Sequence, residues 1–548
     1  MAHEVLIQLV LDSGTKYYSF RDIQMPTQFY EGRILGMGEI GSEISVIPAE
    51  LMVDSFSLEL NNADGAISDL KASESFINRE IKILLGDVAD STSFAQQASF
   101  QSTAWSQSGD SFSIEFSDRT LLVFDQKLSP KFSTTLFPDL PSAEVTPRNL
   151  IPQVIGEVSQ SGGAIPAYRV DPATSQSKYR YVACLGTAKS IDQVYIYGVV
   201  QGSGFTTSQV TYGGHVVTVI DFTSDPRDAD RSDELEITWN GKGLTDDGAT
   251  SGTLLTNPSD IIKQVLLSNG LASGDIDSAG TFADVKNAFL ERGVVGCFVE
   301  LEESTLRELT EKFAKSFNTT IIITADGKLG LTAPKPLRGP AVLEALASLK
   351  EDQIIQDSFG MAGVDTLASS LRFRFGLNFN KNSYGLTQQI DSSAELSNLG
   401  EEIIETVDLP FIQDTSSASA VANDKHWFMQ EARVLVDLQA DPSFYKSLKV
   451  GEEIKLTHFR GLGSGGFKDT IFRVIRKSLS VDNSAMICAL GLVDLSSSLG
   501  FANQFRKIGT ETVLFGEYGI FNAAIQSDIN GLVSESAYPM IKGTPVMI

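Results

Sequence analysis

Short segments in which apolar and polar residues alternate recur along this chain, and turn signals separate them. An apolar residue at every second position buries one face of a β-strand and leaves the other face in solvent. In the first part of the chain these segments are residues 5–11, 16–20, 56–60, 79–85 and 112–116. Residues 61–65, which read N-N-A-D-G, close the third segment as a strong turn. Strands of this length and spacing predict a small antiparallel β-barrel over residues 1–126.

A polar, proline-bearing stretch from about Leu128 to Pro152 separates the first predicted barrel from a second set of strand signals. The strand-like segments after it include residues 179–183, 194–198 and 235–239. The last of these alternates and stops at Asn240-Gly241, a turn signal. These segments predict a β-rich module over residues 127–250.

Helix signals begin at Asn257-Pro258. Asn257 can cap a helix, and Pro258 fits the first turn because its missing N–H costs nothing there. A second helix is expected at residues 282–291. A third starts at residues 305–308 with the capping-box pattern T-x-x-E, and Asp326-Gly327 then marks a hairpin turn. We therefore expect an α+β module over residues 251–340.

Strand signals return in the last third of the chain. Residues 371–379 alternate as a strand with one buried face, within a connecting segment assigned to residues 341–426. Further strand signals lie at residues 432–438, 448–456, 470–475 and 485–490. They predict a second small barrel over residues 427–500. Residues 501–548 have few patterns and are expected to be an extended C-terminal arm that gains order against a partner.

The charge of the chain restricts the kinds of partner it can have. It carries 43 basic and 69 acidic residues, a formal net charge of −26. Proteins that coat nucleic acid need clusters of Lys and Arg against the phosphates, so this balance argues against such a role. It suits a surface that nucleic acid passes without binding, or simply solubility. The sequence has no run of about 18 apolar residues and no basic-then-apolar start, so we expect no membrane span, no signal peptide and assembly in a reducing cytoplasm.

The chain has few of the side chains that catalysis and metal binding require. Its four histidines and three cysteines are scattered singly, whereas such chemistry draws on clusters. They are His3, His215, His426, His458, Cys184, Cys297 and Cys488. Each cysteine is flanked by apolar residues, which predicts buried thiols. The sequence favours a structural protein over an enzyme and predicts no catalytic, cofactor-binding or metal-binding residue.

Three local patterns could indicate a ligand-binding or metal-binding site instead of a structural feature. Residues 461–466 match G-x-G-x-x-G, but the residues after them alternate as a strand where a dinucleotide site needs a helix, so we interpret them as a hairpin loop. Acidic residues crowd the loop from Asp225 to Glu234; a solvated loop is favoured there, with bound calcium left open. His426-Trp427 is interpreted as the start of a barrel strand rather than as a sugar or metal site.

The order of these modules resembles the hub protein at the tail tip or baseplate of long-tailed bacteriophages and related gene-transfer particles. Four passages carry the resemblance. They are residues 56–65 with I-x-I-x-x-G at 81–86; residues 151–171; residues 257–267, 304–317 and 326–329; and residues 448–490 with L-x-x-G-E, I-x-L and F-x-V. Together they span most of residues 1–500, and the C-terminal arm matches none of them.

The resemblance implies a homotrimer in which two related barrels per chain form a pseudo-sixfold ring. Such a ring would join the sixfold tail tube or distal tail protein to threefold tip parts or fibres. It would line or close the channel through which the tape-measure protein and DNA leave, at the distal end of the virion tail. Two alternatives are a tail-associated hydrolase that degrades cell wall and a carbohydrate-binding adhesin or fibre. Adhesins usually show internal repeats, and the sequence shows only a faint likeness between its two predicted barrels.

Overall fold

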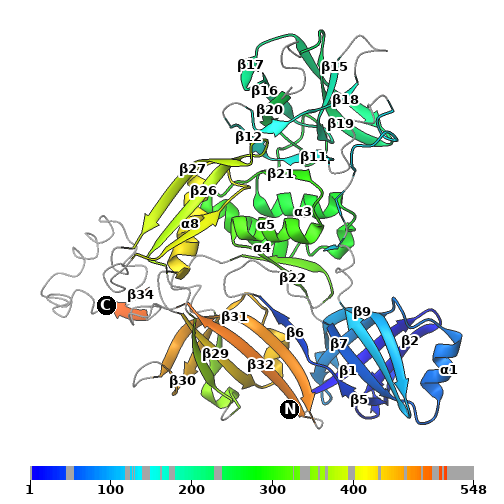
Figure 1. The fold of residues 1–548 in the computed structure, drawn as a ribbon. Helices are drawn as coiled ribbons and strands as arrows, with labels where there is room; N and C mark the ends of the chain where they lie inside the picture. The colour runs from blue at the N-terminus through cyan, green and yellow to red at the C-terminus, as the bar shows by residue number, and fades with distance from the viewer. Residues whose placement is uncertain are drawn as a thin grey trace, which may run out of the picture.

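Strands from residues 3–37 and 55–117 form one β-sheet, and strands from residues 347–364 and 433–494 form most of a second. The two sheets lie side by side, and the elements between residues 149 and 332 and between residues 370 and 429 lie above them in the view of Figure 1. The protein is mainly β, with most of its helices in the middle part. This computed structural model describes residues 3–44, 55–117, 124–125, 127–128, 130–138, 149–160, 163–171, 179–226, 237–324, 326–333, 346–355, 358–364, 368–392, 402–429, 433–461, 466–482, 485–495, 505–508 and 511–514.

The first sheet follows the predicted strands and adds short ones. Its order is β3 (Ile23–Gln24), β4 (Phe29–Gly32), β2 (Gly14–Ser19), β1 (His3–Leu11), β8 (Glu80–Asp87), β9 (Ala95–Ser108), β10 (Ser111–Ser117), β7 (Ser55–Asn61) and β5 (Ile34–Met37). The alternating apolar residues of β7 and β10 face the core in register, with Leu58 opposite Ile114 and Phe56 opposite Phe116. Helix α1 (Ala66–Ser73) and the short turn η1 (Ser91–Ser93) connect strands of this sheet.

The second sheet is built mainly from residues 347–364 and 433–494. Its order is β24 (Ala347–Lys350), β30 (Glu453–His458), β31 (Phe467–Asp482), β32 (Ala485–Asp494), β29 (Arg433–Ala440) and β25 (Gly360–Val364). Strand β6 (Ile40–Glu43), from the first part of the chain, also pairs with β31. Helix α9 (Ser443–Ser447) and the turn η4 (Glu351–Gln353) complete it. Strands β24 and β25 precede residue 427, where the second barrel was expected to start. The division into six domains stays a prediction.

The two predicted barrels are present as two sheets around one continuous apolar core, but they are not closed antiparallel barrels. Among the described residues, strand pairing forms no complete ring in either sheet. In each sheet, two strands that lie close together in the chain have positions near opposite ends of the strand order. In the first sheet these are β4, second in the order, and β5, the last, which are separated by Arg33; in the second sheet they are β24 and β25, the two ends, which both lie within residues 347–364. Strand β4 pairs with β2 in parallel, as β24 does with β30.

The middle of the chain contains two small sheets and an α+β layer. The first small sheet has the order β12 (Glu157–Val158), β20 (Ile237–Lys242), β16 (Ser190–Ile196) and β17 (Val199–Gln201), and β13 (Ile165–Pro166) also pairs with β20. The second has the order β14 (Tyr168–Asp171), β15 (Tyr179–Leu185), β19 (His215–Phe222) and β18 (Phe205–Tyr212). Below them lie α3 (Pro258–Ser268), α4 (Thr281–Arg292), α5 (Leu306–Phe317) and the hairpin β22 (Thr320–Ile323) with β23 (Leu329–Thr332). The turn η3 (Ser273–Asp275) joins α3 to α4, and β11 (Asn149–Ile155) pairs with β21 (Phe298–Glu302).

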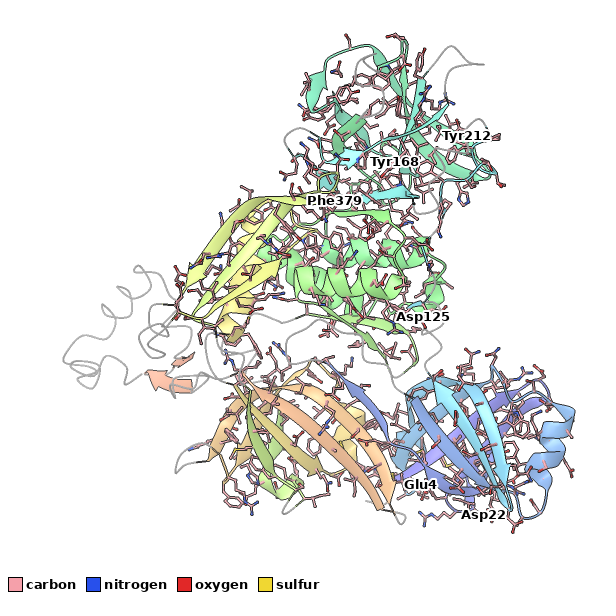
Figure 2. The ribbon with its side chains drawn as sticks, in the orientation of Figure 1. Glu4, Asp22, Asp125, Tyr168, Tyr212 and Phe379 are labelled. Atoms are coloured by element: carbon pink, nitrogen blue, oxygen red, sulfur yellow. The ribbon has the colours of Figure 1, made fainter. Side chains whose placement is uncertain are left out.

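A third group of elements packs against these helices. It contains β27 (Ser383–Asp391), β26 (Ser370–Asn378), β28 (Ile404–Asp408) and helix α8 (Thr415–Met429). Phe379, labelled in Figure 2, packs against both the helical core and the core of the upper sheets. At the C-terminal end, β33 (Phe505–Ile508) pairs with β34 (Glu511–Leu514), and most of the predicted arm lies outside the described residues.

The helix boundaries follow local capping chemistry, as the sequence predicts. The Asn257 side chain accepts a hydrogen bond from the backbone N–H of Ser259 at the start of α3. Thr305 and Glu308 form a reciprocal capping box at the start of α5. Helix α4 ends at Gly293 in the left-handed conformation, where glycine carries no Cβ penalty.

Candidate functional site: the joint between two related sheets

The residues singled out in the sequence lie apart from one another. His426 and Trp427 belong to helix α8, so the expected barrel strand does not start there. The His426 ring is buried, with Nε2 3.4 Å from the carbonyl oxygen of Ser369. The three cysteines are buried free thiols, as predicted, and burial raises the pKa of each to about 12. Within the described residues, no three or more His, Cys, Asp or Glu side chains gather as a possible metal site.

The two candidate loops are only partly described. Residues 462–465 of the glycine-rich loop lie outside the described residues, but antiparallel strands β30 and β31 flank the loop. No helix follows the glycines, which confirms the hairpin interpretation. Residues 227–236 of the acidic loop also lie outside the described residues, so both alternatives for the loop from Asp225 to Glu234 stay predictions.

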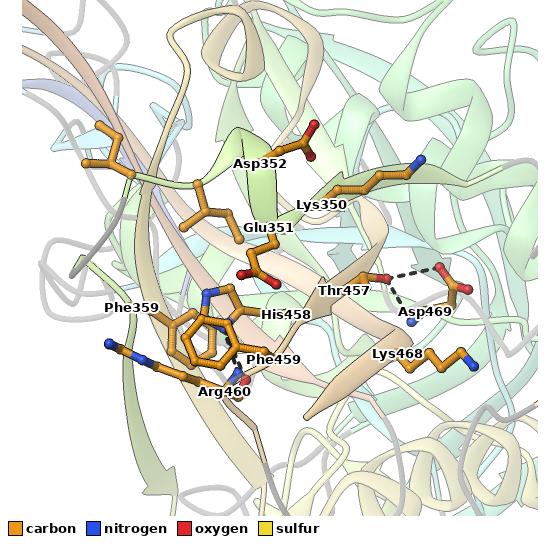
Figure 3. A pocket seen from close by; sticks show the side chains of 12 residues that line it. Lys350, Glu351, Asp352, Phe359, Thr457, His458, Phe459, Arg460, Lys468 and Asp469 are labelled. Atoms are coloured by element: carbon orange, nitrogen blue, oxygen red, sulfur yellow. Dashed lines mark hydrogen bonds between the residues drawn. The ribbon is translucent and has the colours of Figure 1, made fainter. Parts of the chain in front are cut away.

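A pocket of about 760 Å³ opens at the end of the second sheet (Figure 3). His458 stacks on Phe359 with ring centroids 4.0 Å apart, and its Nδ1 accepts the backbone N–H of Arg460 at 3.1 Å. Phe459, 62% exposed, forms part of the rim. Charged residues of both signs also line the pocket. These are Lys350, Glu351, Asp352, Arg460, Lys468 and Asp469. Of these residues, the exposed Phe459 and Arg460 are of the types that are enriched in protein contact surfaces.

The two side-by-side sheets share one strand order. Strands β8, β9, β10, β7 and β5 follow one another as β30, β31, β32, β29 and β25 do, and α1 lies between β7 and β8 in the chain as α9 lies between β29 and β30. Residues 80–83 read E-I-K-I and residues 453–456 read E-I-K-L. They also pair alike, with Glu80 opposite Gln101 of β9 and Glu453 opposite Arg473 of β31.

An irregularity in the pairing also repeats. Beyond Gln101 and Arg473, each long strand has a bulge in which one residue has no counterpart on the neighbouring strand, Thr103 in β9 and Ile475 in β31. Bulges bend a strand and increase its twist, so the two long strands bend at equivalent places. By this register, residues 104–107 of β9 correspond to residues 476–479 of β31. The four-residue likeness at 80–83 and 453–456 was the signal in the sequence for this duplication.

Strand β6 joins the two sheets. It leaves the first sheet after β5 and pairs antiparallel with β31, with Ile40 opposite Leu479 and Glu43 opposite Arg476 (Figure 1). Ile40 is 2% exposed and belongs to the shared core. Gly41 lies so close that a Cβ there would be 3.0 Å from the Cβ of Ser478.

Side-chain contacts reinforce this joint. Lys446 of α9 donates a hydrogen bond to the carbonyl oxygen of Ser93 in η1, and His3 Nε2 lies 3.5 Å from a carboxylate oxygen of Asp441. On β31, Lys477 Nζ donates to the carbonyl oxygens of Tyr445 and Leu448, both at 2.9 Å. Burial lowers the pKa of Lys477 to about 8. Backbone pairing, apolar core and side chains thus hold the two sheets in one arrangement.

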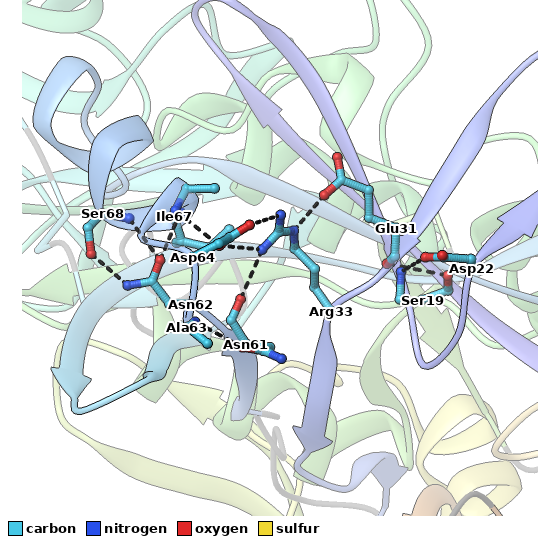
Figure 4. A network of polar contacts seen from close by, with 12 residues as sticks. Ser19, Asp22, Glu31, Arg33, Asn61, Asn62, Ala63, Asp64, Ile67 and Ser68 are labelled. Atoms are coloured by element: carbon cyan, nitrogen blue, oxygen red, sulfur yellow. Dashed lines mark hydrogen bonds and ion pairs between the residues drawn. The ribbon is translucent and has the colours of Figure 1, made fainter.

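A polar network fixes the bend between β4 and β5 (Figure 4). Arg33 donates to both carboxylate oxygens of Asp64, at 2.9 and 2.7 Å, and to Glu31 at 2.5 Å. These hydrogen bonds from Arg33 lower the pKa of Asp64 to about 2. Asn62 Oδ1 accepts the backbone N–H of Ile67 at 2.9 Å and so supports the start of α1. The predicted turn at residues 61–65 therefore also anchors a helix and a bend, which the sequence pattern did not indicate.

Among the described residues, no helix combines the length and the apolar character that crossing a membrane requires. No family model matches the sequence, and no curated protein matches it. Similarity is found among solved structures.

The chain is similar to the 43 kDa tail protein of prophage MuSo2 from Shewanella oneidensis, at 10% identity and a TM-score of 0.38 over 90% of this chain and 98% of that one. It is similar to a tail protein from Neisseria meningitidis MC58, at 8% identity and a TM-score of 0.40 over 90% and 97% of the two chains. It is also similar to a chain in the virion of a gene transfer agent particle, at 10% identity and a TM-score of 0.41 over 70% and 94%. These three solved structures are two tail proteins and a chain of a gene transfer agent particle.

Proposed function

We propose that this chain is a structural hub of the tail tip or baseplate of a long-tailed bacteriophage or gene-transfer particle. The observation that carries the proposal is the pair of sheets with the same strand order, held side by side within one chain. Two related units in one subunit give a trimer six similar units around its axis. Such a ring can contact a sixfold structure on one side and threefold structures on the other.

The proposed partners follow from this symmetry. The sixfold side would bind the distal tail protein or the tail tube, and the threefold side would bind fibres or other tip proteins. The tape-measure protein and DNA would pass through the channel that the trimer lines or closes. A formal net charge of −26 suits this position, because like charge keeps DNA from adhering to the wall.

The proposal assigns no catalytic activity to the chain. In the pocket at the end of the second sheet, His458 is stacked on Phe359 and its Nδ1 accepts a backbone N–H, so the ring is held as part of the packing. The Thr457 hydroxyl likewise has a partner, because its Oγ1 donates a hydrogen bond to Asp469 Oδ1 at 3.2 Å. A cell-wall hydrolase and a carbohydrate-binding adhesin remain the alternatives that an experiment must separate from the hub.

Immunogold electron microscopy of particles from the source, with antibody against this chain, tests the proposal. We expect gold only at the distal end of the tail, together with a trimeric mass for the purified chain. Antigen that is absent from particles, and soluble or on cell surfaces instead, would overturn the hub and favour the hydrolase or the adhesin. Zymography on peptidoglycan would then distinguish these two.

A further inference from the structure

The joint within the chain shows how an added strand docks on a sheet of this type. Strand β30 covers β31 only as far as Arg473, and β31 continues beyond it. Strand β6 occupies the edge that β30 leaves open, at residues 476–479 of β31. A strand edge left open presents unpaired N–H and C=O groups, which another strand can satisfy.

The first sheet has the same open edge. Strand β8 pairs with β9 as far as Gln101, and the backbone of Ser102 still bonds to Asn78 and Arg79. In the part of the chain that the structure describes, the backbone of residues 104–107 pairs with β10 alone. These residues correspond to residues 476–479 of β31, where β6 docks. Trp105, 40% exposed, lies at the centre of this edge.

The surroundings of the two edges also correspond. Lys477 lies over the ring of Tyr445 in α9, at 4.4 Å from the centroid. At the equivalent place in the first sheet, Lys71 of α1 lies over the ring of Trp105 at 4.8 Å, and Ser68 donates to Gln107 at 3.0 Å. Each open edge therefore has a helix beside it, and only the edge on β31 has a strand docked on it among the described residues.

The second sheet presents a strand that matches the open edge. In the first sheet, the backbone N–H of Gly38 donates to the carbonyl oxygen of Ser57 in β7, and the chain then leaves the sheet as β6. In the second sheet, Gly360 of β25 lies opposite Asp437 of β29, the residue that corresponds to Ser57. From Gly360 onward the chain does not cross to another sheet; it forms β25, which continues to pair with β29. Strand β25 pairs with β29 alone in the described structure, and residues 360–363 are exposed.

The exposed apolar side chains of the second sheet gather near β25. Met361 is 45% exposed, Ile355 43% and Phe459 62%, and the last two line the pocket with Phe359, which is next to the start of β25. The β30–β31 hairpin that carries Phe459 corresponds to the β8–β9 connection, whose Ser93 already contacts α9 at the internal joint. The surface equivalent to the one that the first sheet uses at the joint is therefore exposed on the second sheet, and it carries apolar side chains beside the charged residues of the pocket.

We propose that β25 of a second copy of this chain docks on residues 104–107 of β9, as β6 docks on β31 within one chain. Phe459 and Ile355 of the second copy then pack beside Trp105 and α1. The contact is head-to-tail, and a head-to-tail contact produces a closed ring when its rotation closes. This inference rests on the proposed trimeric hub and names the surfaces through which its copies meet.

Cross-linking between two single variants of the full chain tests the contact. We mix Ser106→Cys with Met361→Cys and add a short thiol-specific bifunctional reagent. The native thiols are buried, so the introduced ones are the reactive sites. We expect a covalent dimer in this mixture, and a ladder that stops at a trimer with the double variant. The matched control is Ser106→Cys mixed with Val199→Cys, since Val199 is 65% exposed and lies in β17, away from both surfaces.

A second pair of variants measures the contact without cysteines. Met361→Lys and Phe459→Lys place a charge on the proposed contact surface, and we expect each to shift the chain from trimer towards monomer by at least tenfold in the assembly constant. Val199→Lys should leave the assembly constant unchanged. All three positions are exposed, so the variants should fold.

The outcomes separate the contact from the hub. A chain that is trimeric by mass, but whose Ser106→Cys and Met361→Cys mixture cross-links no more than the Val199→Cys control, overturns the β25–β9 contact and leaves the hub in place. A chain that is monomeric alone, and absent from tails, overturns both. Cross-links confined to the Ser106→Cys and Met361→Cys mixture, with loss of trimer in Met361→Lys, support the contact.

Discussion

Lys477 of β31 lies directly opposite Ser42 of β6, in the strand pair that joins the two sheets. The pair ties a segment near residue 40 to one near residue 477, and the apolar core continues across it. The two sheets therefore share both hydrogen bonds and buried surface. We expect them to behave as one unit when the chain unfolds.

Ile40→Ala should destabilise this unit by about 2–5 kcal/mol, because it removes a buried side chain of the shared core. Leu35→Ala is the matched control: Leu35 lies nearby in β5 and is 54% exposed, so its loss should cost less than about 0.5 kcal/mol. Urea unfolding followed by tryptophan fluorescence measures both. Equal effects of the two variants would show that the joint does not contribute to stability.

Lys477 should make the stability of the chain depend on pH in the alkaline range. Burial lowers its pKa to about 8 from the ordinary 10.5, so between these values the folded chain has released a proton that the unfolded chain still binds. The free energy of unfolding should therefore rise with pH across this window, by at most about 3 kcal/mol. Lys477→Met should remove this rise, whereas Lys468→Met, an exposed lysine of the same strand, should keep it. Parallel curves for wild type and Lys477→Met from urea unfolding would contradict the prediction.

Gly156→Ala should destabilise the chain more than Gly214→Ala. Both glycines have a positive φ, 84° and 86°, so an alanine costs about 1–2 kcal/mol at either place. At Gly156 a Cβ would also lie 2.7 Å from the carbonyl oxygen of Gly296, whereas at Gly214 no atom lies within 4 Å. The difference in melting temperature between the two variants isolates the steric part. Similar melting temperatures would mean that β11 and the Gly296 segment can move apart freely.

The three cysteines should not react with a thiol reagent in the folded chain. They are buried, and burial raises their pKa to about 12, so little thiolate is available. Absorbance on adding a thiol-reactive chromophore should show no fast phase in buffer and three thiols after unfolding. Ser106→Cys, on an exposed part of β9, gives the positive control. A fast phase in the wild type would refute the burial.

The parts of the fold that depend on neighbouring residues are predictable from the sequence. Thr305 Oγ1 accepts the backbone N–H of Glu308 at 3.2 Å, and Glu308 accepts that of Thr305 at 2.9 Å, as the T-x-x-E pattern indicates. The alternating strands and the Asp326-Gly327 hairpin turn are likewise local signals. Each of these features depends on interactions within a few residues, so a short segment of the sequence is enough to predict it.

Helix α8 was missed because the buried residues of its first half are small. Ala418, Val421 and Ala422 are buried, but they give no stripe of large apolar side chains. The joint was missed for another reason. Residues 40–43 read I-G-S-E, with Ile40 as their only large apolar residue, and their partner strand lies at the other end of the sequence. Pairing between such distant segments leaves no periodic signal, and the repeated E-I-K pattern indicates the two related sheets but not this pairing.

The crossing of β6 has a consequence for the order of events at the ribosome. Residues 40–43 leave the exit tunnel long before residues 476–479, with which they pair. Strand β6 therefore has no partner strand until residues 476–479 have been synthesised. Contacts so far apart in sequence form slowly, and a strand that waits is open to wrong pairing. A prematurely ended chain would keep that strand unplaced, so truncated products should be poor competitors for a place in an assembling particle.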